Sequence, residues 1–136
     1  MGSYVSAIIS GLEDIDMVIC GIPLCDIPEL FSSHTTRRLR KRAEKHDILG
    51  PSLRSLFCLV SPEALTPVVP QDHRMIIAGA ADRITPNMQA SKLSKAWQTS
   101  IDWFPGGHVS YFWSRPALQK VNQKLRQFAE TEEASK

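Results

Sequence analysis

The sequence predicts a single α/β domain built on a small parallel sheet. Apolar runs at 17–22, 75–81 and 99–104 are short and end at turn residues, as strands buried on both faces do. Segments with helical spacing of apolar residues lie before, between and after these runs. With 136 residues, 43% of them hydrophobic and 22% charged, the chain has enough apolar material for the core of one globular domain.

The first helix is expected over residues 2–12, where four aliphatic side chains recur at helical spacing. A polar break separates this helix from the first strand at 17–22, which Pro23 ends. Small residues between the aliphatic ones allow the helix to pack closely on the sheet. The chain is therefore expected to enter the sheet through a helix followed by a buried strand.

The pattern changes from residue 28 to residue 69. Short helical pieces are interrupted by proline at 50–51, 61–62 and 66–67, and the charges gather in the first piece. Range 28–69 is therefore predicted to be a cap-like helical insertion between two strands.

The second strand is predicted at 75–81 and the third at 99–104. Between them, Thr85 is expected to cap a helix that has Pro86 at its first position. A last helix is predicted over 116–129, with its leucines, Val121 and Phe128 on one face. Alternation of strands and helices predicts parallel strands joined by crossovers.

Charge and composition exclude several partners. The formal net charge of +2 is small, and we interpret the one basic run, Arg37–Arg42, as a solvated helix face rather than a nucleic-acid patch. The chain lacks both an apolar span of membrane length and a signal-peptide pattern, which predicts no membrane span and a cytoplasmic location. Because the histidines and cysteines lack paired ligand spacing, we expect no metal site and no cofactor.

Cysteines and aromatic residues are assigned to the interior. The three cysteines, an odd number in or beside apolar runs, are expected to be buried free thiols. They are Cys20, Cys25 and Cys58. The same interior position is expected for four aromatic residues. They are Trp97, Trp103, Phe104 and Trp113.

The candidate catalytic residues follow two consecutive strands. Asp82 comes just after the second strand and His108 just after the third, and the carboxyl ends of parallel strands form one rim of the sheet. Taken singly, Asp82 could simply end a strand and His108 could be a hydrogen-bonded turn residue. Their joint placement favours a carboxylate that orients an imidazole, the base that a serine nucleophile needs near neutral pH.

These residues resemble the α/β-hydrolase superfamily, in which a serine nucleophile, an acid and a histidine follow in chain order. Gly79-Ala80-Ala81-Asp82 matches the acid turn and Gly106-Gly107-His108 matches the histidine turn. Met1-Gly2-Ser3-Tyr4 matches the residues that follow the nucleophile. Segment 106–111 is similar to the branch typified by α/β-hydrolase domain-containing protein 18.

The resemblance implies a partial α/β-hydrolase fold, with 1–136 as the C-terminal part of the domain and the N-terminal half of the sheet missing. The nucleophile serine would lie just upstream of Met1, whose backbone N–H would serve the oxyanion hole. Gly107 and Phe112 would line the pocket for a small-molecule acyl substrate. Without the missing half, the strand at 17–22 would expose an unpaired edge.

Two functions from different classes are therefore expected. The first is the C-terminal piece of a serine-type hydrolase of esters or related acyl bonds, inactive alone because it lacks the nucleophile. The alternative is a non-catalytic α/β remnant or protein-interaction module.

Overall fold

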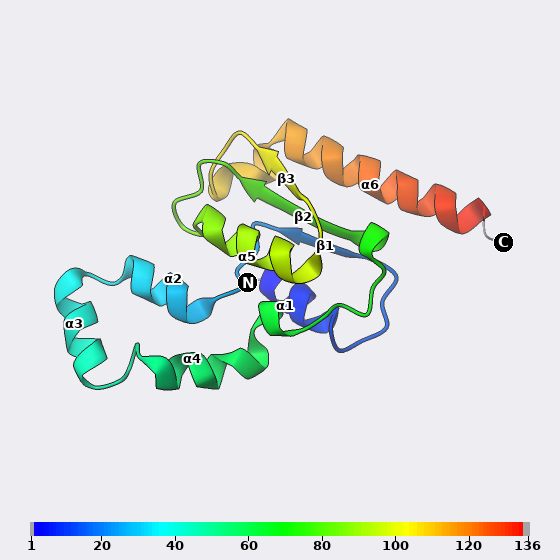
Figure 1. The fold of residues 1–136 in the computed structure, drawn as a ribbon. Helices are drawn as coiled ribbons and strands as arrows, with labels where there is room; N and C mark the ends of the chain where they lie inside the picture. Colours follow the sequence, from blue (N-terminus) through cyan, green and yellow to red (C-terminus); the bar gives the residue numbers. More distant parts are fainter. Residues whose placement is uncertain (1, 135–136) are drawn as a thin grey trace.

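A parallel sheet of three strands forms the centre of the protein in the computed structural model, which describes residues 2–134 (Figure 1). The strands are β1 (Val18–Gly21), β2 (Arg74–Gly79) and β3 (Ile101–Phe104), in the order β1-β2-β3. Both neighbouring pairs are parallel, with Cys20 opposite Ile76 and Gly79 opposite Phe104. The predicted α/β class with a parallel sheet is confirmed.

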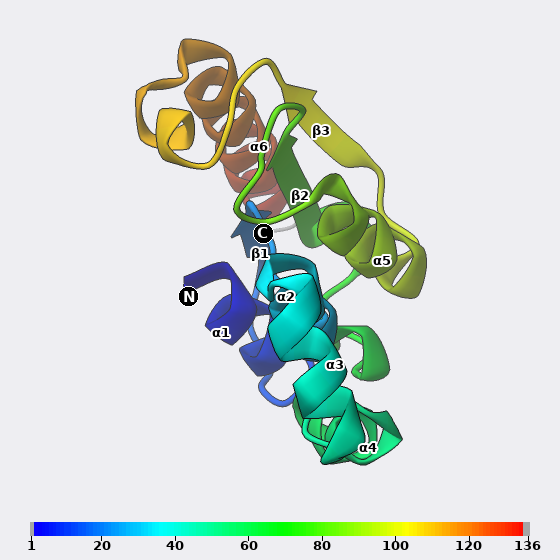
Figure 2. The ribbon, with the colours of Figure 1, turned by 90° about the vertical axis from the view of Figure 1, so that its left-hand side faces the viewer.

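Helices cover both faces of the sheet (Figure 2). On one face, α1 (Gly2–Ile9) and α5 (Asn87–Trp97) pack against β1 and β2 in a core that includes Ala7, Ile76 and Leu93. On the other face, α6 (Arg115–Ala134) covers β2 and β3 in a smaller core around Ile77, Phe104 and Ala117. Burial on both faces explains why the strands are apolar runs without alternation.

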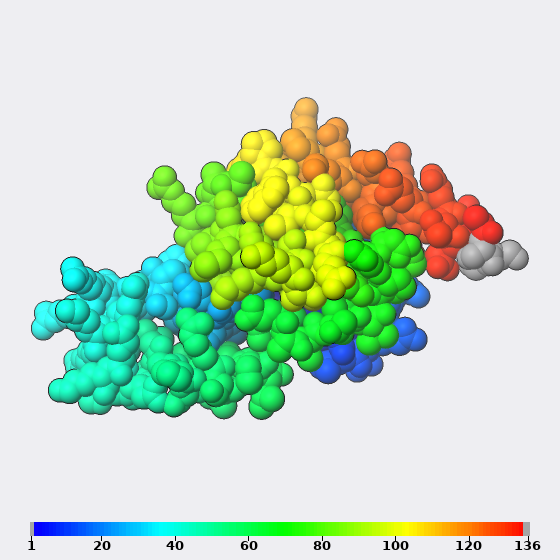
Figure 3. All heavy atoms as spheres, viewed as in Figure 1, coloured from blue at the N-terminus to red at the C-terminus, as the bar shows by residue number. Residues whose placement is uncertain are grey.

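Between β1 and β2 the chain makes a helical arm that projects away from the sheet (Figures 1 and 3). The arm consists of α2 (Ile27–His34), α3 (Arg37–Lys45) and α4 (Pro51–Phe57). Neither α3 nor α4 contains a buried residue, so both helices lie outside the two cores. Short 3-10 turns complete the chain at Cys58–Val60, Pro62–Ala64, Gln71–His73 and Val109–Trp113.

The predicted cap of α5 is wrong. The helix begins at Asn87, and the residue before it, Pro86, has an extended backbone and no capping side chain. Thr85 has other partners, because its N–H binds the Asp82 carboxylate and its hydroxyl faces the His108 ring. The sequence pattern identified the turn but not the direction of the threonine side chain.

Helix lengths differ from the prediction at both ends of the chain. Helix α1 ends at Ile9 instead of residue 12, and α6 extends to Ala134. Despite the 20 residues of α6, no helix within residues 2–134 has the length and apolar character to cross a membrane.

The interior assignment holds for some residues and fails for others. Cys20 and Cys25 are buried free thiols, and burial raises the pKa of both to about 12. Cys58 is a free thiol but is exposed, because the helical arm has no core to bury it. Likewise Trp97 and Phe104 are fully buried, whereas Trp103 is partly exposed and Trp113 is 81% exposed on the turn after β3.

One edge of the sheet has no strand beside it in the described part of the chain. There β1 pairs only with β2, which leaves the other side of β1 without a ladder. On the adjacent helix and its extension, Val5, Ile9 and Leu12 are exposed. Open strand edges and exposed apolar side chains together mark a surface suited to association.

The two-sided core predicts where stability resides. Leu93→Ala, at a fully buried position of α5, should lower the free energy of unfolding by about 3 kcal/mol, since a large-to-small change leaves a cavity. Leu118→Ala, on the half-exposed face of α6, should cost below about 1 kcal/mol. Urea unfolding of the two variants checks this, and equal midpoints would contradict the assigned core.

Candidate active site

Backbone hydrogen bonds hold the loops after β2 and β3 together beyond the ends of the strands. The Ala80 N–H donates to the Phe104 carbonyl at 3.0 Å, and the Ala81 N–H donates to the Gly106 carbonyl at 2.9 Å. A side chain at Gly79 would lie 2.5 Å from the Gly106 oxygen, so this close approach requires glycine. The two loops that carry the candidate acid and base thus form one unit.

Asp82 is fixed in this unit as a buried acceptor. Its side chain is 2% exposed, and its Oδ1 accepts the backbone N–H groups of Ile84 at 2.8 Å and Thr85 at 2.9 Å. The turn that follows β2 therefore holds the carboxylate through one oxygen. The second oxygen, Oδ2, points to His108.

The His108 ring presents opposite nitrogens to the acid and to solvent. Its Nδ1 lies 3.0 Å from Asp82 Oδ2, and an ionised carboxylate can only accept a hydrogen bond. In the neutral ring the proton therefore resides on Nδ1, which makes Nε2 the acceptor. The ring is 38% exposed, and no residue in the described part of the chain hydrogen-bonds Nε2. This arrangement suits a base that takes a proton from a nucleophile.

Thr85 is a third member of the site that the sequence interpretation missed. Its hydroxyl lies 3.3 Å from His108 Nδ1, and the residue is 8% exposed. Thr85 thus contacts the acid through its backbone and the imidazole through its side chain. The signal was present as a hydroxyl residue three positions after Asp82, a spacing at which an Asp turn returns the chain toward its own carboxylate.

The structure describes two of the other predicted site residues. Gly107 donates its N–H to Ser110 Oγ at 2.8 Å, and that hydroxyl donates back to the Gly107 carbonyl, so this pair shapes the histidine turn. Phe112 is 72% exposed and its ring packs edge-on against Tyr111. Their pocket-lining role stays a prediction. Met1, the predicted oxyanion donor, lies outside the described residues.

The first turn of α1 lies at the same edge of the sheet. Ser3 donates its hydroxyl to the carbonyl of Gly21, the last residue of β1. A side chain at Gly21 would collide with the Tyr111 ring, which comes three residues after His108. The start of α1, the end of β1 and the histidine turn are therefore adjacent.

Backbone strain occurs at this edge. Ile22, directly after β1, has φ of 53°, a left-handed conformation that is unusual for a β-branched residue. Such a conformation costs on the order of 1–3 kcal/mol and is enriched near functional sites. The strain therefore adds weight to a functional role for this edge.

Neither a metal site nor a nucleic-acid site emerges from the described residues. Among residues 2–134, no group of three His, Cys, Asp or Glu side chains could hold a metal ion. The basic run lies on α3, and Arg37, Arg38, Lys41 and Arg42 are exposed to solvent. The interpretation of this run as a solvated helix face is confirmed.

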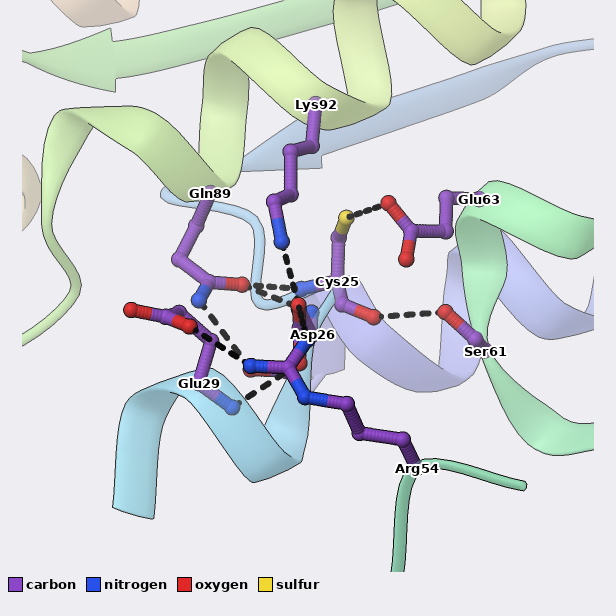
Figure 4. Close-up of polar contacts among 8 residues, drawn as sticks. All are labelled: Cys25, Asp26, Glu29, Arg54, Ser61, Glu63, Gln89 and Lys92. Carbon is purple, nitrogen blue, oxygen red and sulfur yellow. Dashed lines mark hydrogen bonds and ion pairs between the residues drawn. The ribbon is translucent and has the colours of Figure 1, made fainter. Parts of the chain in front are cut away.

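A second polar cluster joins the helical arm to the domain (Figure 4). The carboxamide oxygen of buried Gln89, on α5, accepts the backbone N–H groups of Cys25 at 3.0 Å and Asp26 at 2.7 Å. Asp26 in turn caps α2 by accepting the Glu29 N–H at 2.8 Å, and it pairs with Lys92 of α5. These contacts fix the segment that leads from β1 into the arm.

The ion pair shifts both of its members toward their charged forms. Burial raises the pKa of Asp26, but the hydrogen bonds from Lys92 and the Glu29 N–H and the nearby cations outweigh it, so the pKa is below its usual value. Burial lowers the pKa of Lys92, and the contact with Asp26 outweighs this effect and raises the pKa. Stabilisation by the pair is therefore present between about pH 4 and pH 10.

Comparisons with known proteins give relatives but no function. The chain is 35% identical over 130 residues to "Uncharacterized protein MT2702" of Mycobacterium tuberculosis strain CDC 1551 / Oshkosh and equally to "Uncharacterized protein Rv2627c" of strain H37Rv. The alignment covers 93% of this chain and 31% of each relative, so the chain spans under a third of their length. No family model and no solved structure matches the chain.

The hydrogen bond to Asp82 should set the tautomer of His108. We expect neutral His108 to carry its proton on Nδ1, and we expect Asp82→Ala to shift the ring toward the Nε2–H form. Long-range ¹H–¹⁵N correlation NMR distinguishes the two forms. His73 is an internal control, because its Nδ1 lies 3.0 Å from the Asp16 carbonyl and is independent of Asp82. An Nε2–H tautomer in the unmodified protein would contradict the assigned geometry.

The ion pair of Asp26 predicts a specific pH dependence. A depressed pKa means that its stabilisation is lost as the pH falls below about 4, through the folded-state pKa. Asp26→Asn should lower the free energy of unfolding by about 1–2 kcal/mol at pH 7 and flatten its decline below pH 4.

The matched control is Asp102→Asn, which breaks the partly exposed pair with Lys120. This change should cost below about 1 kcal/mol. Urea titrations from pH 3 to pH 8 compare the two variants. An unaltered acid limb in Asp26→Asn would remove Asp26 as its source.

Proposed function

We propose that this chain carries the acid and base of a serine-type hydrolase of esters or related acyl bonds, with Asp82 as the acid and His108 as the base. The single observation that carries the proposal is the 3.0 Å contact between His108 Nδ1 and the buried Asp82 Oδ2. It leaves Nε2 as the unprotonated nitrogen on the more exposed side of the ring.

The chemistry of each residue follows from this contact. His108 accepts the hydroxyl proton of the nucleophile during attack and returns it to the leaving group. Asp82 holds the ring in the required tautomer and stabilises the imidazolium that forms. Thr85, which contacts the same Nδ1, limits rotation of the ring. No cofactor enters this mechanism.

The nucleophile is proposed to come from a serine just before Met1, outside the described residues. Two observations support this placement. The first turn of α1 lies at the edge of the sheet that carries the histidine turn, with Ser3 bound to Gly21 and Gly21 against Tyr111. In the mycobacterial relatives the matching region is 31% of a longer chain, which leaves room for further residues of the same domain. By the same proposal, 1–136 is the C-terminal part of a partial α/β-hydrolase fold and 28–69 is its cap.

The proposed substrate is a small molecule with an acyl bond, and the proposed compartment is the cytoplasm. A nucleophile activated by imidazole attacks a carbonyl carbon, which accounts for the class of bond. Three free thiols, two of them buried, fit a reducing compartment.

An interaction module is the second candidate function. The observation in its favour is the open side of β1, together with the exposed Val5, Ile9 and Leu12. Such a surface binds another strand and helix without requiring any chemistry at His108.

A fluorophosphonate probe, which labels activated serines, tests the proposal on the chain extended by its upstream reading frame. We expect labelling of the extended protein, and a loss of about 10³-fold or more in His108→Ala because the base is absent. Asp82→Asn should lose a similar factor, since the ring is no longer held in the required tautomer.

Matched controls separate catalysis from folding. Asp102→Asn changes a carboxylate that pairs with Lys120, and His73→Gln changes a ring that packs on Phe128, so both should label normally. Undiminished labelling of His108→Ala would contradict the proposal. A folded extended protein without any labelling would favour the interaction module.

A further inference from the structure

The helical arm contains an open groove that the proposed chemistry does not use. Helices α2, α3 and α4 surround a volume of about 860 Å³, lined by apolar side chains except for Thr35, Arg42 and His46. Phe31 and Leu39 line it and are largely exposed, although each has an apolar partner surface nearby. The groove is therefore an apolar surface left open to water.

The sequence of α3 divides its two faces between the groove and solvent. Leu39, Arg42, Ala43 and His46 line the groove, and their spacing of three and four residues places them on one side of the helix. Other basic residues of the same helix, including Arg38, are exposed away from this face. One end of the apolar lining thus carries a cation and an imidazole.

The size and charge of the groove select its occupant. Its volume lies within the usual range of about 300–1,000 Å³ for small-molecule pockets, whereas a stable protein partner would need about 800 Å² of contact on each side. None of the lining residues is acidic, and Arg42 and His46 complement a negative group. An apolar chain with one anionic end satisfies both requirements.

We propose that the groove binds a long-chain carboxylate, with its alkyl chain along α2–α4 and its carboxylate at Arg42 and His46. The binding does not require hydrolysis at His108, so the inference stands apart from the proposed function. The groove nevertheless adjoins the acid loop, because His34, at the end of α2, hydrogen-bonds the Ile84 carbonyl at 2.7 Å.

Dodecanoate, below its micelle concentration, tests the proposal with the full chain. It should displace a fluorescent dansyl-labelled undecanoic acid in a saturable, one-to-one manner. Hexanoate should bind at least about tenfold more weakly, because each methylene removed from the groove loses part of its transfer free energy. Equal competition by both acids, or no saturable binding by a folded chain, would overturn the proposal.

Two pairs of variants locate the site. Leu39→Gln should weaken dodecanoate binding about tenfold, whereas Leu125→Gln, at an exposed leucine of α6, should leave it unchanged. Ala43→Trp, which fills the groove without removing an apolar residue, should also abolish displacement. Normal binding by Ala43→Trp, or an equal loss in Leu125→Gln, would overturn the assignment.

The anionic end has its own control on the same helix. Arg42→Gln should weaken dodecanoate about fivefold but not 1-dodecanol, since only the carboxylate uses the guanidinium, while Arg38→Gln should alter neither. His108→Ala should bind dodecanoate normally, which distinguishes failure of the hydrolase proposal from failure of this one. Displacement of the probe by an acidic amphipathic helical peptide, without displacement by dodecanoate, would replace the lipid with a protein partner and overturn the proposal.

Discussion

The parallel pairing of β2 and β3 is the constraint on which the candidate site depends. Register fixes Gly79 beside Phe104, and two further backbone hydrogen bonds extend the pairing into the loops. Because Gly79 has no side chain, the loops come close enough for Asp82 to contact His108. A shift of this register by one residue would separate the acid from the base without changing either side chain.

The rest of the chain depends on this sheet to different degrees. Helices α1, α5 and α6 share its cores, whereas α3 and α4 bury no residue in them. Gln89 and Asp26 connect the two parts, since both lie where the chain leaves β1 for the arm. The arm is thus held at its base by directed polar contacts rather than by a core of its own.

Much of the fold could be predicted from the sequence because buried parallel strands are short apolar runs with punctuated ends. All three strands, and the pairing of Asp82 with His108 at one rim, follow from that pattern. The cap of α5 could not be predicted, because Thr85 had to satisfy Asp82 and His108 at once. Trp113 was assigned to the core by residue type, yet it lies on a turn that faces solvent.

The absence of buried residues in α3 and α4 has a consequence for the cooperativity of the domain. Local opening costs little where few apolar contacts are lost, so amide protons of these helices exchange with solvent through fluctuations that leave the sheet intact. Amides of β2, such as that of Ile77, exchange only when the sheet itself opens. The chain therefore combines two regimes of backbone protection in one small protein, and the boundary between them falls at Asp26.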